Sequence, residues 1–178
     1  IIIDNSSLND AGLWEAVFKI GIYFNMFFTV PISIYFLPRF SGLKDPTAIK
    51  ELMISCFIFS LPLMSVFGLF IYIFRGPIVD ILFSSEFTEI KTLIPVLLMA
   101  EFFKISAGFF GVFFMANRLL YENIRNEFIW VLLFIVATYY AIESYGLSGV
   151  VYSYLISCII WLVLNLWCFI FHASDLKD

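Results

Sequence analysis

Residues 93–115 read LIPVLLMAEFFKISAGFFGVFFM, a run that is apolar except for Glu101, Lys104 and Ser106. A helix needs about 20 mostly apolar residues to cross the hydrocarbon core of a membrane. Because the backbone finds no water there, it has to satisfy its own hydrogen bonds, as a helix does. The stretch therefore predicts a transmembrane helix.

The rest of the chain repeats this pattern. Of its 178 residues, 62% are hydrophobic and 13% are charged, against about 45–50% and about 25% in soluble domains. Four more segments are long and apolar enough to span, at about 14–37, 52–74, 123–142 and 147–171. The sequence predicts an all-α polytopic transmembrane helix bundle with about five spanning helices, forming a single membrane domain over residues 1–178.

Prolines and polar clusters separate the expected spans. We expect the first span to end at Leu37, directly before Pro38, and the second to end before Arg75. The segment 77–86 begins with a proline and is too short to cross a membrane, so it predicts a helix lying in the interface. Residues 143–146 predict a tight turn between the last two spans.

Basic residues are unevenly shared between alternate connections. One set contains Arg39, Lys44, Lys50, Arg118, Arg125 and Lys177, and the other contains Arg75 and Lys91. The positive-inside rule places the richer set in the cytoplasm. The N-terminal end is then expected outside and the C-terminal end inside, and an odd number of spans with an outside start predicts a further helix upstream.

Charged side chains inside the third expected span are the first candidate site. One stripe at helical spacing contains Leu97, Glu101, Lys104, Gly108 and Gly111, and the opposite side carries Phe102, Phe109 and Phe113. We expect the aromatic side to face lipid, and the charged side to face another helix or a cavity. A charge in hydrocarbon costs about 2.5–3.5 kcal/mol, so such residues usually face the bundle interior.

The first expected span carries a similar stripe, with Glu15, Lys19 and, at its edge, Asn25. Two interpretations of the Glu15–Lys19 and Glu101–Lys104 pairs remain open. Each pair is either a structural salt bridge or part of a wet cavity whose cation accepts an anionic headgroup. Lys104 lies too deep in its helix for easy snorkelling to the interface, which favours the cavity there.

Several functions find no support in the residues. The chain has no basic patch suited to nucleic acid, no nucleophile–base pair and no phosphate-binding loop. Its one histidine and three cysteines lack the spacing of metal ligands. We therefore predict a protein that is not an enzyme and that uses neither a metal nor another cofactor.

Four segments resemble motifs of bacterial O-antigen and enterobacterial-common-antigen flippases, in the order in which that family has them. They are WEAVFK at 14–19, SIYFLPRFS at 33–41, EFFKIS at 101–106 and GLSGVVYSY at 146–154. Lys19 and Lys104 match basic positions of these motifs. Glu101 stands where the family usually has Asp, Ala100 replaces a Gly, and Glu15 replaces a Gln.

The resemblance implies the multidrug/oligosaccharidyl-lipid/polysaccharide exporter superfamily, whose members have twelve helices in two lobes around a cavity. The chain would supply helices eight to twelve and lack the N-terminal lobe. Its substrate would be an undecaprenyl-diphosphate-linked oligosaccharide repeat unit, moved across the bacterial inner membrane for O-antigen or lipopolysaccharide synthesis. Residues Lys104, Glu101, Lys19, Glu15 and Asn25 would then line the cavity.

Two other functions remain open. A drug/cation antiporter of the same superfamily would use a buried carboxylate such as Glu101, although a neighbouring Lys104 disfavours cation binding. The second function is a non-transporting one, either as a membrane partner protein or as a polymerase-like membrane enzyme. A polymerase-like enzyme is expected to have a long outer loop with clustered arginines, and the outer connections here carry only Arg75 and Lys91.

Overall fold

The computed structural model describes residues 8–82 and 90–175, and all of the regular structure in these two ranges is helical. The elements are α2 (Leu8–Ser41), α3 (Pro46–Ile73), α4 (Arg75–Leu82), α5 (Ile90–Ala116) and α6 (Leu120–Asp175). Four of them, α2, α3, α5 and α6, are long and apolar enough to cross a membrane. The predicted all-α polytopic bundle is confirmed.

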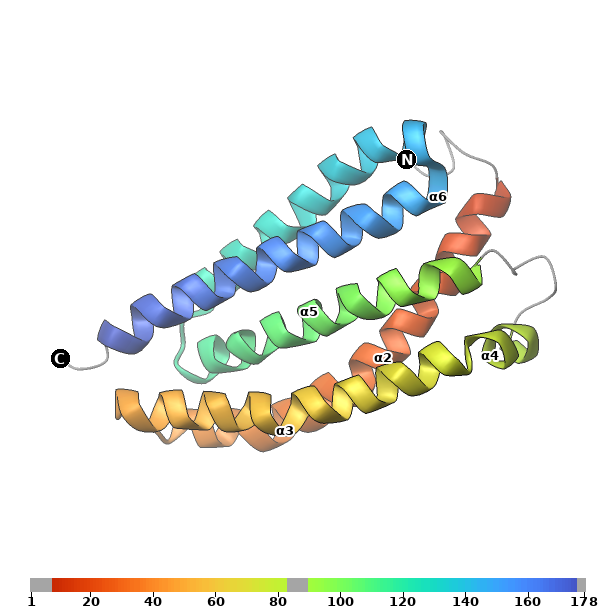
Figure 1. The fold of residues 1–178 in the computed structure, drawn as a ribbon. Coiled ribbons are helices and arrows are strands. Elements are labelled where there is room, and N and C mark those ends of the chain that lie inside the picture. The colour runs from red at the N-terminus through yellow and green to blue at the C-terminus, as the bar shows by residue number, and fades with distance from the viewer. Residues whose placement is uncertain (1–7, 83–89, 176–178) are drawn as a thin grey trace.

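Helix α6 contains two of the predicted spans. Its backbone leaves helical geometry at Gly146, where φ is 54° and ψ is −139°. Figure 1 shows the two arms, residues 120–145 and 147–175, running side by side in opposite directions. The expected turn near 143–146 is therefore present, and residues 8–82 and 90–175 together make five long helical passes.

Several helix ends differ from those expected. Helix α2 continues through Pro31 and Pro38 to Ser41, so the predicted end at Leu37 is wrong. A membrane helix tolerates proline because neighbouring groups compensate for the lost backbone bond. Helix α4 begins at Arg75, ahead of the expected Pro77, and residues 83–86 of the predicted interfacial helix lie outside the described residues.

The start of α3 shows what the expected boundary at Leu52 missed. Asp45 caps the helix, because its carboxylate accepts hydrogen bonds from the backbone N–H groups of Thr47 and Ala48 at 3.3 and 3.1 Å. Pro46 occupies the first helical turn, where its missing N–H costs nothing. This Asp–Pro pair starts the helix six residues before the apolar run does.

Helix α5 is the centre of the bundle. It contacts α2, α3, α4 and α6, and 61% of its apolar stretch is buried, against 22% for α3. Phe109 and Phe113, expected to face lipid, are buried against rings of Phe57, Phe40 and Phe169. That expectation is wrong because neighbouring helices cover α5 on more than one side.

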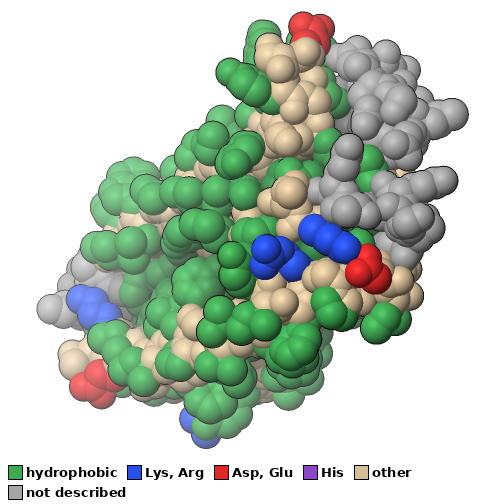
Figure 2. Space-filling model, turned by 45° about the vertical axis from the view of Figure 1, so that its right-hand side comes forward, with side chains coloured by type: hydrophobic (Ala, Val, Ile, Leu, Met, Phe, Trp, Pro, Cys, Tyr) green, Lys and Arg blue, Asp and Glu red, His purple; other side chains and the backbone are tan. Residues whose placement is uncertain are grey.

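The outside of the bundle is apolar. Large hydrophobic side chains of α3 and α6 such as Phe59, Val66 and Trp167 are two-thirds exposed. Figure 2 shows hydrophobic side chains over most of one face, with only a few charged groups among them. A surface of this kind requires lipid rather than water around it, so the chain is a multi-pass membrane protein.

Candidate functional site

A carboxylate lies at the meeting point of three helices. Glu101 on α5 is fully buried. Its Oε2 accepts a hydrogen bond from Asn25 Nδ2 of α2 at 3.0 Å, and its Oε1 accepts one from the Tyr154 hydroxyl of the second arm of α6 at 2.7 Å. Burying a charged group is costly unless it is hydrogen-bonded, and these two donors meet that need.

Lys104 completes this group, which we call the Glu101 network (Asn25, Glu101, Lys104 and Tyr154). Its Nζ donates to the Tyr154 hydroxyl at 2.8 Å and lies 3.9 Å from Glu101 Oε1. The Tyr154 hydroxyl therefore accepts from the cation and donates to the carboxylate. The Lys104 side chain is 21% exposed, while that of Glu101 has no exposure.

Aromatic rings surround the cation. Lys104 Nζ lies 5.4 Å from the ring centres of Trp130 and Tyr154 and 5.8 Å from that of Phe18. A cation within about 6 Å of an aromatic face is stabilised by the ring's quadrupole. The rings thus surround the Lys104 ammonium group on several sides while leaving part of the side chain accessible.

The residues of α2 position Asn25 for this contact. The Thr29 hydroxyl donates to the Asn25 backbone carbonyl at 2.9 Å and lies 3.3 Å from Asn25 Oδ1. One turn earlier, Gly21 leaves room for the carboxylate, because a Cβ there would lie 2.8 Å from Glu101 Oε1. Thr29 thus contacts the backbone and side chain of Asn25, and Gly21 leaves the space that the Glu101 carboxylate occupies.

The two charged pairs expected from the sequence have different surroundings. Glu101, Lys104 and Asn25 come together, as described. Glu15 and Lys19 form their own salt bridge at 2.8 Å on an exposed side of α2, with side chains 68% and 54% exposed. Within the described residues these two side chains take no part in the Glu101 network, and a cavity role for them stays a prediction.

Tyr154 is the member that sequence reasoning missed. It is almost completely buried, and the rings of Trp14, Phe18, Trp130 and Phe134 contact it. Within an apolar span it resembles any other core aromatic. The available signal was its hydroxyl, which needs a hydrogen-bond partner when a tyrosine is buried.

A second polar cluster joins the two arms of α6 near their far ends. Arg125 donates to Asn126 Oδ1 at 3.1 Å and lies 3.0 Å from Cys168 Sγ, and Asn126 Nδ2 lies 3.4 Å from Asn165 Oδ1. These contacts satisfy buried polar groups between adjacent helices and tie the arms together. In the part of the chain that the structure describes, no three His, Cys, Asp or Glu side chains are grouped to hold a metal.

Comparison with known proteins found two curated relatives. Both are lipid III flippases, one from Escherichia coli (strain K12) and one from Shigella flexneri, and each is 26% identical to the chain over 155 residues. The match covers 87% of this chain and 37% of each relative. No family model and no solved structure matches. The chain is thus distantly similar to proteins named as lipid flippases and spans less than half of their length.

Proposed function

We propose that this chain is part of a flippase that moves a lipid-linked oligosaccharide across the bacterial inner membrane. Its similarity to lipid III flippases supports the class of transporter. The motif resemblance supports, as substrate, an undecaprenyl-diphosphate-linked repeat unit for O-antigen or a related surface polysaccharide. On this proposal the chain acts by binding and translocation, without bond cleavage.

The observation that carries the proposal is the environment of Lys104. An ammonium group has three N–H donors, and one of them donates to Tyr154. The side chain keeps partial exposure in the middle of a spanning helix. A diphosphate cannot cross about 30 Å of hydrocarbon unaided. A fixed, partly accessible cation lowers that barrier, while the prenyl tail stays in lipid.

The proposed transport unit is larger than this chain. The relatives are long enough to contain further helices, and the superfamily resemblance implies a second, N-terminal lobe facing this one. We propose that the cavity between the lobes is lined by Lys104, Glu101 and Asn25, with Lys19 and Glu15 nearer its outer end. Access would alternate by rocking of the lobes, with the start of α2 on the periplasmic side.

Complementation tests this proposal directly. The full-length protein containing this chain is expressed in a strain that lacks its own lipid-linked oligosaccharide flippase, and surface polysaccharide is measured by immunoblot. We expect export with the unchanged protein, reduced export with Lys104→Ala and partial recovery with Lys104→Arg. Lys91→Ala is the control, because Lys91 lies at the start of α5, away from the Glu101 network, and pairs with Asp80 of α4. Full export with Lys104→Ala contradicts the proposed role.

The contacts of Glu101 argue against a drug/cation antiporter. Both carboxylate oxygens already accept hydrogen bonds, and Lys104 lies 3.9 Å from one of them. A cationic drug would have to displace these partners. Drug resistance on expression, with no change in surface polysaccharide, would favour the antiporter instead.

A further inference from the structure

A trough between α2 and α3 lies away from the Glu101 network. One pocket, of about 550 Å³, is lined by Pro31, Tyr35, Phe36 and Arg39 of α2 and by Leu52, Ser55 and Phe59 of α3. A second pocket, of about 650 Å³, shares Pro31 and Phe59 with it and continues along both helices to Tyr23 and Leu63. We call the two together the α2–α3 trough.

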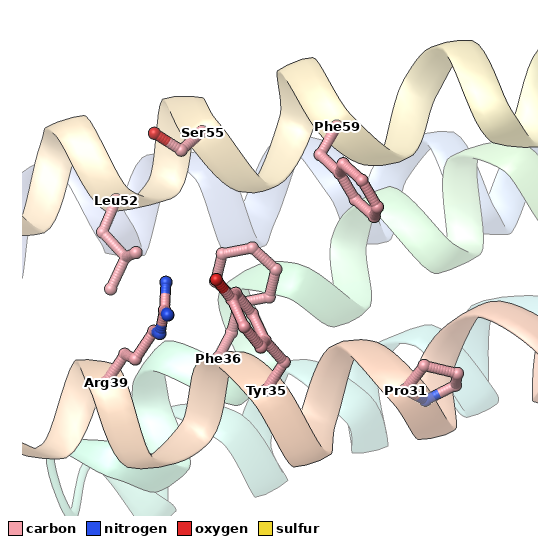
Figure 3. Close-up of a pocket in the computed structure, with 7 residues that line it drawn as sticks. All are labelled: Pro31, Tyr35, Phe36, Arg39, Leu52, Ser55 and Phe59. Carbon is pink, nitrogen blue, oxygen red and sulfur yellow. The ribbon is translucent and has the colours of Figure 1, made fainter.

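The trough is apolar along its length and polar at one end. Figure 3 shows Arg39 reaching from the last turn of α2 toward α3, beside Tyr35 and below Leu52, with the apolar side chains of Pro31 and Phe59 farther along. Its guanidinium stacks on the Tyr35 ring at 3.8 Å from the ring centre. Within the described part of the chain, no carboxylate lies within ion-pair distance of Arg39. The end of the trough thus presents a cation without a fixed counter-charge.

Further basic residues lie on the same connection. Lys44 and Lys50 are both exposed, and the carboxylate of Asp45 is occupied at the N-terminus of α3. Glu51 is the one other acidic residue there. Three cations against these two carboxylates leave the α2–α3 connection with an excess of one positive charge, and the positive-inside rule places this connection at the cytoplasmic surface.

The length of the trough fits a hydrocarbon chain. From Arg39 to Tyr23 the helix rises about 24 Å at 1.5 Å per residue, and one leaflet contributes about 15 Å of hydrocarbon. An acyl chain can therefore lie in the trough over the whole depth of its leaflet while its headgroup stays at Arg39. Basic pockets between transmembrane helices on the cytoplasmic side are suited to anionic lipid headgroups.

We infer that the α2–α3 trough binds an anionic phospholipid of the cytoplasmic leaflet. The phosphate pairs with the guanidinium of Arg39, which Tyr35 holds in place by stacking, and the phenolic hydroxyl of Tyr35 lines the same pocket. One acyl chain lies against Pro31, Phe36, Leu52 and Phe59. This site is separate from the network that we propose for transport and does not depend on it.

Binding is tested on the full-length protein in nanodiscs. A phosphatidylglycerol with a photoreactive acyl chain is crosslinked, and the labelled peptides are mapped by mass spectrometry. We expect labels on α2 and α3 along the trough, and competition by unlabelled phosphatidylglycerol about fivefold stronger than by phosphatidylcholine, since a basic residue near the surface is worth about that factor.

Two variants have matched controls. Arg39→Gln should remove the preference for the anionic lipid, while Arg75→Gln should not, because Arg75 also stacks on a tyrosine but lies at the other end of the bundle. Ser55→Trp fills the trough and should abolish labelling there. Ser65→Trp is its control, because both serines donate to the backbone carbonyl four residues before them.

Three results would overturn the inference. They are equal competition by the neutral lipid, unchanged labelling with both Arg39→Gln and Ser55→Trp, and labelling of the trough by a polyprenyl diphosphate probe alone. The last would assign the trough to the transported lipid. Failure of the unchanged protein to restore export in the flippase-deficient strain, with lipid labelling of the trough intact, would count against the transport proposal only.

Discussion

Single side chains decide the chemistry of the bundle interior. Glu101 is held by donors from two other helices, and the Tyr154 hydroxyl connects it to Lys104. A hydroxyl can donate and accept at once, so Tyr154 separates the two charges without leaving either unpaired. Gly21 gives the carboxylate its space. Two predictions belong to this scale.

Tyr154→Phe removes the bridging hydroxyl and nothing else. Glu101 then loses a hydrogen bond in a buried position, and stability should fall by about 1–3 kcal/mol. The measurement is thermal unfolding of the purified full-length protein in detergent. Tyr152→Phe is the control because Tyr152 lies two residues away and is half exposed. Equal melting temperatures of the two variants would contradict the bridging role.

Gly21→Ala places a methyl group 2.8 Å from Glu101 Oε1. The carboxylate must move and strain its bonds to Asn25 and Tyr154, so we expect destabilisation by about 1–3 kcal/mol. Gly108→Ala should be neutral or slightly stabilising, because nothing lies within 4 Å of its Cβ position and alanine favours a helix. Thermal unfolding of both variants in the same detergent checks this. A Gly21→Ala variant as stable as the unchanged protein would show that the Glu101 network accommodates the added methyl group without strain.

At the scale of elements, the hairpin of α6 depends on a reversal over a few residues. The backbone of Gly146 has a positive φ, which residues that carry a Cβ rarely adopt. Three residues later, a Cβ on Gly149 would lie 2.6 Å from the backbone carbonyl oxygen of Ala141. The two arms therefore approach each other closely directly after the turn, and the Arg125–Asn126–Cys168 contacts join them again at the far end.

Gly149→Ala should force the arms of α6 apart near the turn. Because the obstructing atom belongs to the backbone, a side-chain rotation cannot relieve the contact, and we expect a loss of about 1–3 kcal/mol. Ser148→Ala is the neighbouring control, since Ser148 is exposed. The measurement is the melting temperature of each variant in detergent, which should be lower for Gly149→Ala than for Ser148→Ala. A Gly149→Ala protein as stable as the Ser148→Ala protein would contradict the close approach of the two arms of α6 near Gly149 and Ala141.

For the whole molecule, the described helices have their connections at two opposite ends. Figure 1 shows the α2–α3 and α5–α6 connections at one end and the α3–α4 junction and the bend of α6 at the other. Arg39, Lys44, Lys50 and Arg118 belong to the first end, and Arg75 and Lys91 to the second. The arrangement brings together the loops that the sequence grouped by charge, and which end faces the cytoplasm stays a prediction.

Cysteine labelling tests this orientation. The three native cysteines are buried, so they contribute little background to an impermeant maleimide. In intact spheroplasts we expect Ser144→Cys to react from outside and Lys44→Cys to react only after lysis. Lys44 and Ser144 are both exposed, so burial does not explain a difference. Labelling of Lys44→Cys in intact spheroplasts would show that the α2–α3 connection faces outside, opposite to the predicted orientation.

Much of the site was visible in the sequence, and what was missed has a common cause. Glu101 and Lys104 stood out because ionised groups are rare in an apolar span, and their spacing put them on one face. Asn25 was at the edge of a polar stripe, and the structure brings it to Glu101. Tyr154 and Gly21 carry no such signal, because each looks like ordinary core until its neighbour on another helix is known.

Hydropathy and charge spacing alone determined that this chain is a set of membrane-crossing helices with a turn near Gly146 and two charged pairs inside them. These are local properties, since each helix satisfies its own backbone and each stripe follows from 3.6 residues per turn. Only the tertiary structure decided that α5 lies at the centre, that Phe109 and Phe113 are buried rather than lipid-facing, and that Glu15 and Lys19 stay apart from Glu101. The physical reason is that periodicity defines the faces of a helix, whereas the number of neighbours covering those faces depends on how all the helices pack.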